Sequence, residues 1–182
     1  NENLTPEKAD TYTVGVVIEP DMVIPGLVMA VDYYNIQIEN AISTIGAQTI
    51  INQCGQTGDA TLCGFVNRNP GSLTLWTPGS SVTNTTRNIG GVDTSGVDIS
   101  ASYNRTIGAG RLNLSFNGSW LDSYFFDTGV PTLDTDGAFE CAGYHGNSCG
   151  TPLPEWRHQM RLGYTFDSGF GASIRWRHFG AV

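Results

Sequence analysis

The sequence predicts an all-β chain whose strands form an antiparallel up-and-down sheet. Six segments alternate apolar and polar side chains, which is the pattern of a strand with one apolar and one polar face. The connections between these segments are alternately short and long. The composition has 23 Gly, many Ser, Thr and Asn, and only 9 Lys plus Arg, which is typical of strands joined by turns rather than of helices.

The first two strands are predicted at residues 11–19 and from residue 27 to about 34, with a short connection at residues 20–26. Apolar or aromatic residues share one face in each, and these are Tyr12, Val14, Val16 and Ile18, then Leu27, Met29, Val31 and Tyr33. After Asn35 the apolar positions change face at Ile36 and Ile38. This change indicates either a bulge or the point at which the strand leaves its apolar surroundings.

A long irregular stretch follows at about residues 39–81. Its beginning, residues 41–54, has isoleucines near one side of a short helix, although Gly46 weakens that prediction. The third strand is predicted from about Val82 through Asn104, and the turn "RTIGAG" leads into the fourth, from Leu112 to about Phe125.

A second long loop is predicted at about residues 127–155. The fifth strand runs from Arg157 to Phe166 and the sixth covers residues 172–177, with the turn "DSGFG" between them. The long connections therefore all fall at one end of the predicted sheet and the short turns at the other.

Alternation alone does not say what covers the apolar face. Long loops at one end and short turns at the other are typical of an outer-membrane barrel, whose strands need only about 9 to 11 residues to cross. No run approaches the roughly 20 apolar residues of a membrane helix. Six strands are fewer than the barrel minimum of about eight, so we expect them to be part of a wider barrel. The alternative is a secreted, lectin-like β-sandwich module in which the apolar faces pack on each other.

Aromatic residues and charge add to this interpretation. Several aromatic residues stand towards strand ends, where the interfacial girdles of barrels lie, and these are Tyr33, Tyr103, Trp120, Trp156, Tyr164 and Trp176. The formal net charge of -8 argues against a nucleic-acid-binding surface, which should be basic.

Four cysteines form two local pairs, Cys54 with Cys63 and Cys141 with Cys149. Zinc sites usually have closer spacing, so two short disulfide loops are favoured, each stabilising its loop by roughly 2 to 3 kcal/mol. Disulfides indicate an oxidising compartment. The opening "NENLTPEKADTYTVG" lacks the features of an export signal, and the chain ends in or just after a strand. We therefore expect it to be a piece of a larger protein.

No motif predicts catalysis or metal binding. "GNSCG" fits the pattern of a nucleophile elbow around Ser148, but Cys149 and two prolines replace the helix that should follow. "DTDG", Asp134 to Gly137, lacks the regular acidic positions of a calcium loop. The three histidines have no ligand spacing. We expect no enzymatic activity, no metal and no cofactor.

Several stretches resemble, in order, the barrel of TonB-dependent outer-membrane receptors. They cover nearly the whole chain and are "NENLTPEKADTYTVGVVIEP", "VDYYNIQIENAIS", "INQC" with a following "TLC", "TSGVDISASY", "LNLSFNGSWL", "CGTPLPEWRHQMRLGY" and "IRWRHFG". The resemblance implies a plugged barrel of about 22 strands, of which residues 1–182 supply six from the later part. By the same resemblance, we expect the plug domain, the TonB box and the terminal strands to lie outside residues 1–182. Residues 39–81 and 127–155 would be extracellular loops.

The resemblance also implies a function. These receptors lie in the outer membrane of Gram-negative bacteria and import scarce substrates with energy coupled through TonB. Substrates in the family are ferric siderophores, cobalamin, haem or oligosaccharides, and no motif in this sequence selects one. The implied partners are outer-membrane lipid, the protein's own plug domain, the TonB complex and a small-molecule or oligosaccharide substrate.

Candidate site residues follow from position and chemistry rather than from a family site. Polar residues on the strands would line the lumen or hydrogen-bond the plug, and these are Asp98, Asn113, Asn117, Arg161 and Arg175. Loop residues with aromatic faces or hydrogen-bond donors would contact substrate, and these are Arg68, Trp76, Tyr144 and His145.

Overall fold

The computed structural model describes residues 4–127, 129, 137–146 and 149–182. The chain divides into two compact units. One contains residues 10–37, 93–125 and 140–182, and includes most of the long strands. The other contains residues 1–9, 38–92 and 126–139, and includes the first long loop.

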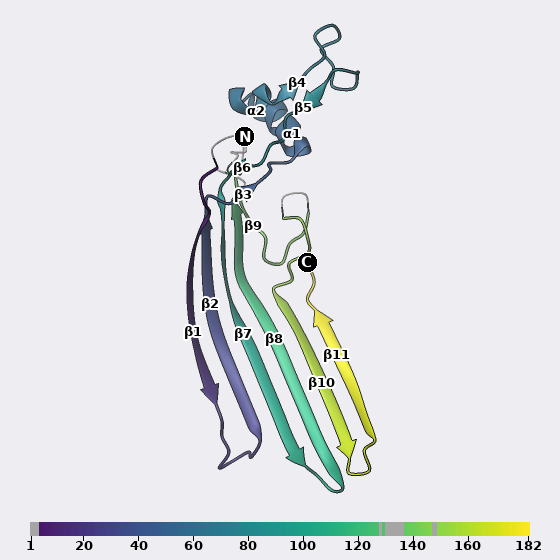
Figure 1. Ribbon diagram of the computed structural model, residues 1–182. Helices are drawn as coiled ribbons and strands as arrows, with labels where there is room; N and C mark the ends of the chain where they lie inside the picture. Colours follow the sequence, from purple (N-terminus) through teal and green to yellow (C-terminus); the bar gives the residue numbers. More distant parts are fainter. Residues whose placement is uncertain (1–3, 128, 130–136, 147–148) are drawn as a thin grey trace. The chain divides into compact units, whose positions relative to one another are not determined.

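Six long strands form one antiparallel meander in the first of these units (Figure 1). Their order in the sheet is their order in the chain: β1 (Lys8–Ile18), β2 (Leu27–Glu39), β7 (Gly91–Thr106), β8 (Gly110–Asp127), β10 (Trp156–Phe166) and β11 (Gly171–Phe179). A short strand, β9 (Ala138–Glu140), pairs with β8. The six segments predicted from alternation are therefore strands of a single sheet.

The register of β8, β10 and β11 divides their side chains into two faces. Leu114 lies opposite Leu162, which lies opposite Ile174 on β11. One position along, Arg161 lies between Ser115 and Arg175. Because directly opposed residues in a ladder share a face, apolar and polar rows alternate across the three strands.

The short turns lie together at one end of this sheet, drawn at the bottom of Figure 1. The β7–β8 turn uses Gly108 at φ 62° and the β10–β11 turn uses Gly169 at φ 92°. These are left-handed conformations that glycine adopts at no steric cost. Each tight turn places a strand antiparallel to its predecessor. Both long connections therefore start at the opposite end of the strands.

The first long loop contains regular structure. Helix α1 (Ala47–Thr57) is followed by α2 (Ala60–Gly64), and two short pairs join β3 (Ile42–Ser43) to β6 (Arg87–Asn88) and β4 (Val66–Asn67) to β5 (Ser81–Val82). Among the described residues of the unit that contains this loop, the apolar residues Ile50, Leu62 and Ile89 are nearly fully buried. The loop thus has a small core of its own.

Two boundaries differ from the sequence prediction. The helix begins at Ala47 rather than near residue 41, because Gly46 has φ 94° and its N–H donates to Asn84 Oδ1 at 3.1 Å. The third strand begins at Gly91 rather than at Val82, which pairs with Val66 in the short hairpin of the loop. Both errors come from contacts between residues distant in the sequence.

In the described part of the chain, the apolar face of the long strands does not pack on a second sheet. Side chains on it have large exposed fractions, for example 63% for Tyr12, 54% for Val16 and 69% for Ile174. A β-sandwich would bury such a face, so the lectin-like alternative is not supported. Neither helix in the described part of the chain has the length and apolar character needed to cross a membrane.

Candidate functional site on the polar face of the sheet

The polar face of β8, β10 and β11 carries rows of hydrogen-bonding side chains. In one row Gln159 lies between Asn117 and Arg177, and in the next Arg161 lies between Ser115 and Arg175. The register therefore brings the predicted residues Arg161 and Arg175 directly opposite each other, on the same face as Asn117.

Uncharged neighbours hold two of these arginines in place. Arg161 donates from Nε and Nη2 to Ser173 Oγ at 3.3 and 3.0 Å. Arg177 donates from Nε to Gln159 Oε1 at 3.2 Å. These acceptors orient the guanidinium groups without neutralising them, so their positive charge remains available to a group that faces this part of the sheet.

Acidic side chains lie on the neighbouring strands. Asp32 of β2 and Asp98 of β7 line one depression of about 510 Å³ with Asn117, Arg157 and Arg177. The same face thus changes from acidic on β2 and β7 to basic on β10 and β11. Such a surface can orient a partner whose own charges are complementary to this pattern.

A second depression of about 480 Å³ lies nearer the short turns. It contains Asn113 and Arg161 together with Ser102, Ser115 and Ser173. Four of the five predicted lumen residues therefore line one depression or the other, and the fifth, Arg175, lies opposite Arg161.

The opposite face carries an aromatic cluster around His158 near the start of β10. Trp156 donates from Nε1 to His158 Nδ1 at 2.8 Å, and the His158 ring centroid lies 5.1 Å from that of His178 and 4.6 Å from that of Trp176. Trp156 also lies opposite Trp120 on β8. Amphipathic rings at the end of an apolar face are typical of the membrane–water interface.

Glu140 anchors the second long loop to the end of β8. Its Oε1 accepts from the N–H groups of Tyr124 and Ala142 at 2.8 and 2.9 Å, and its Oε2 accepts from Ser123 Oγ at 2.9 Å. Partial burial raises the pKa of Glu140. The hydrogen bonds to its carboxylate lower that pKa by a larger amount, so the pKa is below its ordinary value. The loop base is therefore built for an ionised glutamate.

The Cys141–Cys149 disulfide lies beside this anchor. Cys141 is fully buried, and its N–H donates to the Tyr124 carbonyl at 2.9 Å. Two predicted substrate contacts, Tyr144 and His145, are exposed in this loop, with 61% of Tyr144 accessible. Their backbone is thus attached to a fixed base while their side chains face outward.

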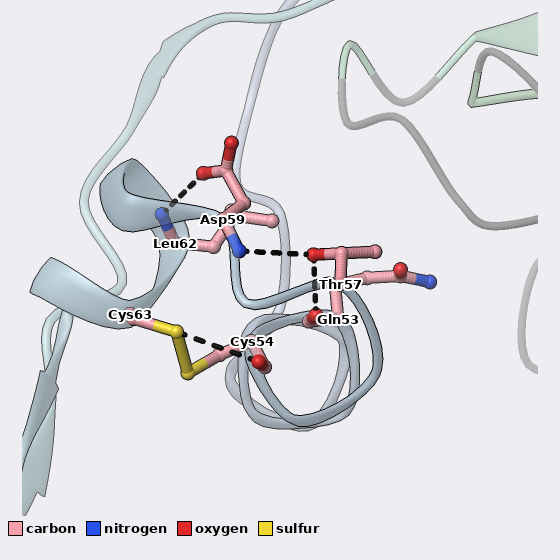
Figure 2. Close-up of a disulfide and its surroundings, with 6 residues drawn as sticks. All are labelled: Gln53, Cys54, Thr57, Asp59, Leu62 and Cys63. Atoms are coloured by element: carbon pink, nitrogen blue, oxygen red, sulfur yellow. Dashed lines mark hydrogen bonds between the residues drawn. A yellow bond between two sulfur atoms is a disulfide. The ribbon is translucent and has the colours of Figure 1, made fainter.

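The Cys54–Cys63 disulfide joins α1 to α2 in the first long loop, as Figure 2 shows. Asp59 caps the second helix, because its Oδ1 accepts from Leu62 N–H at 2.9 Å, and its own N–H donates to Thr57 Oγ1 at 3.2 Å. The tight link between the helices is therefore fixed by both the disulfide and the cap.

The segment between β4 and β5 displays Trp76, 91% of which is exposed. Asn69 organises this segment: its Oδ1 accepts from the N–H groups of Gly71 and Ser72 at 2.9 and 3.0 Å, and its Nδ2 donates to the Pro78 carbonyl at 2.9 Å. Arg68 donates from Nη1 to the Leu73 carbonyl at 3.3 Å. Of the two candidates in this segment, Trp76 is presented outward and Arg68 also has a local structural role.

Other residues of the polar face were not predicted as site residues. Arg157 lines the same depression as Asp98, and its position two residues before Gln159 on the polar face could have identified it. Tyr34 and Ile36 line a cavity with Leu153, and its local signal in the sequence is the change of apolar parity at Ile36. Among the described residues, no group of three or more His, Cys, Asp or Glu could hold a metal ion. Ser148 and Asp134–Asp136 lie outside the described residues.

Comparison with known families identifies the family to which the chain belongs. A family model described as "TonB dependent receptor-like, beta-barrel" matches residues 1–182. No curated protein and no solved structure matches the sequence. Members of this family are outer-membrane proteins of Gram-negative bacteria that take part in TonB-coupled transport and are not enzymes. The chain belongs to the β-barrel family of TonB-dependent receptors.

Proposed function

We propose that this chain forms part of the wall and outer vestibule of a transporter that captures a scarce substrate at the cell surface and imports it into the periplasm. The observation that carries the proposal is the division of the sheet into two faces. Apolar rows such as Leu114–Leu162–Ile174 suit contact with lipid, whereas the rows with Asn117 and Arg161 suit a polar, filled lumen.

The charge pattern of the polar face supports contact with a plug domain. Aspartates on β2 and β7 and arginines on β10 and β11, for example Asp98 and Arg175, would meet complementary groups on a plug or line the route of the substrate. Arg161 and Arg177 donate to neutral acceptors. An acidic group on a plug could therefore pair with either arginine without competing with a carboxylate already bonded to it in these hydrogen bonds. TonB would then remodel the plug and release the substrate.

The two disulfide-bounded loops would supply the first contacts with substrate. Trp76 and Tyr144 offer exposed aromatic faces, and Arg68 and His145 offer hydrogen-bond donors. These chemistries suit a ferric siderophore, an oligosaccharide, cobalamin or haem. The loops therefore support capture of a substrate at the surface without choosing among these classes.

A deletion strain tests the proposal. We expect the strain to lose uptake of one substrate class when radiolabelled iron chelates, cobalamin, haem and oligosaccharides are supplied singly, and a plasmid copy of the gene should restore it. The same loss should follow when the TonB energy source is removed with a protonophore. Unchanged uptake of every substrate would refute a transport function.

A further inference from the structure

A cavity of about 540 Å³ lies between residues 152–154 of the second long loop and the polar face of the sheet. Leu153 and the two flanking prolines line one side, and Tyr34, Ile36 and Leu121 line the other. This volume is within the range of about 300 to 1,000 Å³ found for small-molecule sites. All of these residues belong to the same compact unit of the chain.

The loop side of the cavity is held at both ends. The Leu153 carbonyl accepts from Gly143 N–H at 2.7 Å, and the Glu155 carbonyl accepts from Leu121 N–H of β8 at 2.8 Å. Gly143 follows Cys141, whose disulfide and buried position fix the loop base. A ligand entering this cavity would therefore not have to order the loop first, which lowers the entropic cost of binding.

The end of the Tyr34 ring packs against β7 at Gly96, which has no side chain. A Cβ on Gly96 would lie 2.5 Å from Tyr34 Oη and 2.8 Å from its Cζ, closer than real Cβ contacts. Gly96 is itself buried. The pair places an aromatic ring with a hydroxyl group in the cavity wall, which is the kind of surface against which the C–H face of a sugar ring stacks.

The charged groups in the cavity wall are one acid and one base. Asp98 and Arg157 both line it, together with the hydroxyl groups of Thr94 and Ser119. A strongly anionic chelate would meet the Asp98 carboxylate, and an apolar ligand would leave both charged groups desolvated without partners. A neutral ligand with several hydroxyl groups satisfies both, because a carboxylate accepts and a guanidinium donates hydrogen bonds.

The cavity also continues along the sheet. Asp98, Ser119 and Arg157 line the adjoining depression of about 510 Å³, which extends to Asn117 and other polar residues of β10 and β11. A chain of sugar rings could therefore occupy both, with its first ring beneath Leu153.

We propose that this cavity is a saccharide subsite and that the transported substrate is a neutral oligosaccharide. The inference rests on the proposed transport function and assigns its substrate class. Tyr34 stacks on a ring, Asp98 accepts from its hydroxyl groups, and Arg157 donates to its oxygens. The contact with Leu153 closes the ring's other side.

Binding to isolated outer membranes that contain the protein tests the inference. The probes are fluorescent neutral oligosaccharides of α- and β-linked hexoses, pentoses and N-acetylhexosamines, and a parallel set of ferric siderophores. We expect an oligosaccharide to bind, and Tyr34→Ala and Asp98→Asn each to weaken its Kd at least tenfold. The matched control Tyr33→Ala, whose side chain is on the opposite face, should change Kd less than twofold. Resistance of the folded barrel to SDS at room temperature verifies that each variant is folded.

The outcomes separate this inference from the transport proposal. Binding of ferric siderophores with no oligosaccharide bound would overturn the saccharide subsite and leave transport intact. Oligosaccharide binding that Tyr34→Ala and Asp98→Asn do not weaken would overturn the placement of the subsite. Normal uptake of all substrates by the deletion strain would overturn both.

Discussion

Replacing Leu114 with Arg should destabilise the folded protein far more than the same replacement at its neighbour Asn113. Leu114 lies in the apolar row with Leu162 and Ile174, whereas Asn113 lies opposite Gly163 on the polar face. Asn113 is a better control than Ser115, because Ser115 lies directly opposite Arg161 and a new Arg there would add like-charge repulsion.

The magnitude follows from the distance of Leu114 to the bilayer centre. The Leu112–Tyr164 and Trp120–Trp156 rows are eight residues apart on β8, about 27 Å along the strand and about 21 Å along the membrane normal at a tilt of about 40°. Leu114 is two residues from the middle row, about 5 Å from the centre. Arg costs about 2–4 kcal/mol at the midplane of such a barrel, so we expect about 2–3 kcal/mol for Leu114→Arg. Asn113→Arg should stay within about 1 kcal/mol.

Equilibrium unfolding in phospholipid vesicles measures the difference. The folded fraction is read from the gel shift between folded and unfolded protein over a urea series, and 2–3 kcal/mol corresponds to roughly a 30- to 150-fold change in the folding equilibrium constant. A cost that is equal at the two positions, or greater at Asn113, would refute the assignment of the faces to lipid and lumen.

Three further predictions concern the loops. Glu140 has a lowered pKa in the folded protein, so the stability it contributes is fully present above the ordinary glutamate pKa and is lost as the pH falls through that lowered pKa. Glu140→Gln should remove this pH dependence from proteolysis of the second loop, and an unchanged profile would contradict the anchor. Replacing both Cys54 and Cys63 with Ser should cost about 2–3 kcal/mol locally, seen as faster hydrogen exchange in α1 but not in the long strands. Asn69→Ala should speed chymotryptic cleavage after Trp76, since its side chain makes three hydrogen bonds within the segment, and equal cleavage rates would show that these bonds do not order it.

The strands of the sheet could be predicted because their signal is local. Alternation with period two reports directly which side chains share a face, and the rows around Leu114 and Arg161 follow it without exception. The start of β7 could not be located in this way, because Val82 has the apolar character of a strand residue and pairs instead with Val66. A short hairpin and a long strand give the same local pattern when only the partner differs.

The candidate site could be predicted only in part, because local alternation does not report contacts between residues that are distant in the sequence. Polar parity predicts that Asp98, Asn113, Asn117, Arg161 and Arg175 lie on the polar face, and parity is a property of the strand alone. The cavity instead depends on a glycine of β7 beneath a tyrosine of β2, and on a loop held back over the sheet by backbone hydrogen bonds. None of these contacts joins residues that are close in the sequence.

Ile36 shows how the two levels of information combine. Its apolar side chain has the wrong parity for a lipid-facing position, and the sequence leaves a bulge or a change of surroundings as explanations. Tyr34 and Ile36 line the same cavity, two residues apart on β2, so the strand keeps its regular alternation and the surroundings change instead. An apolar residue on the polar face under Leu153 can contact the apolar surface of a ligand bound in this cavity. The break in the hydrophobic pattern therefore marks the same place on the sheet as the cavity, whose wall also contains Asp98 and Arg157.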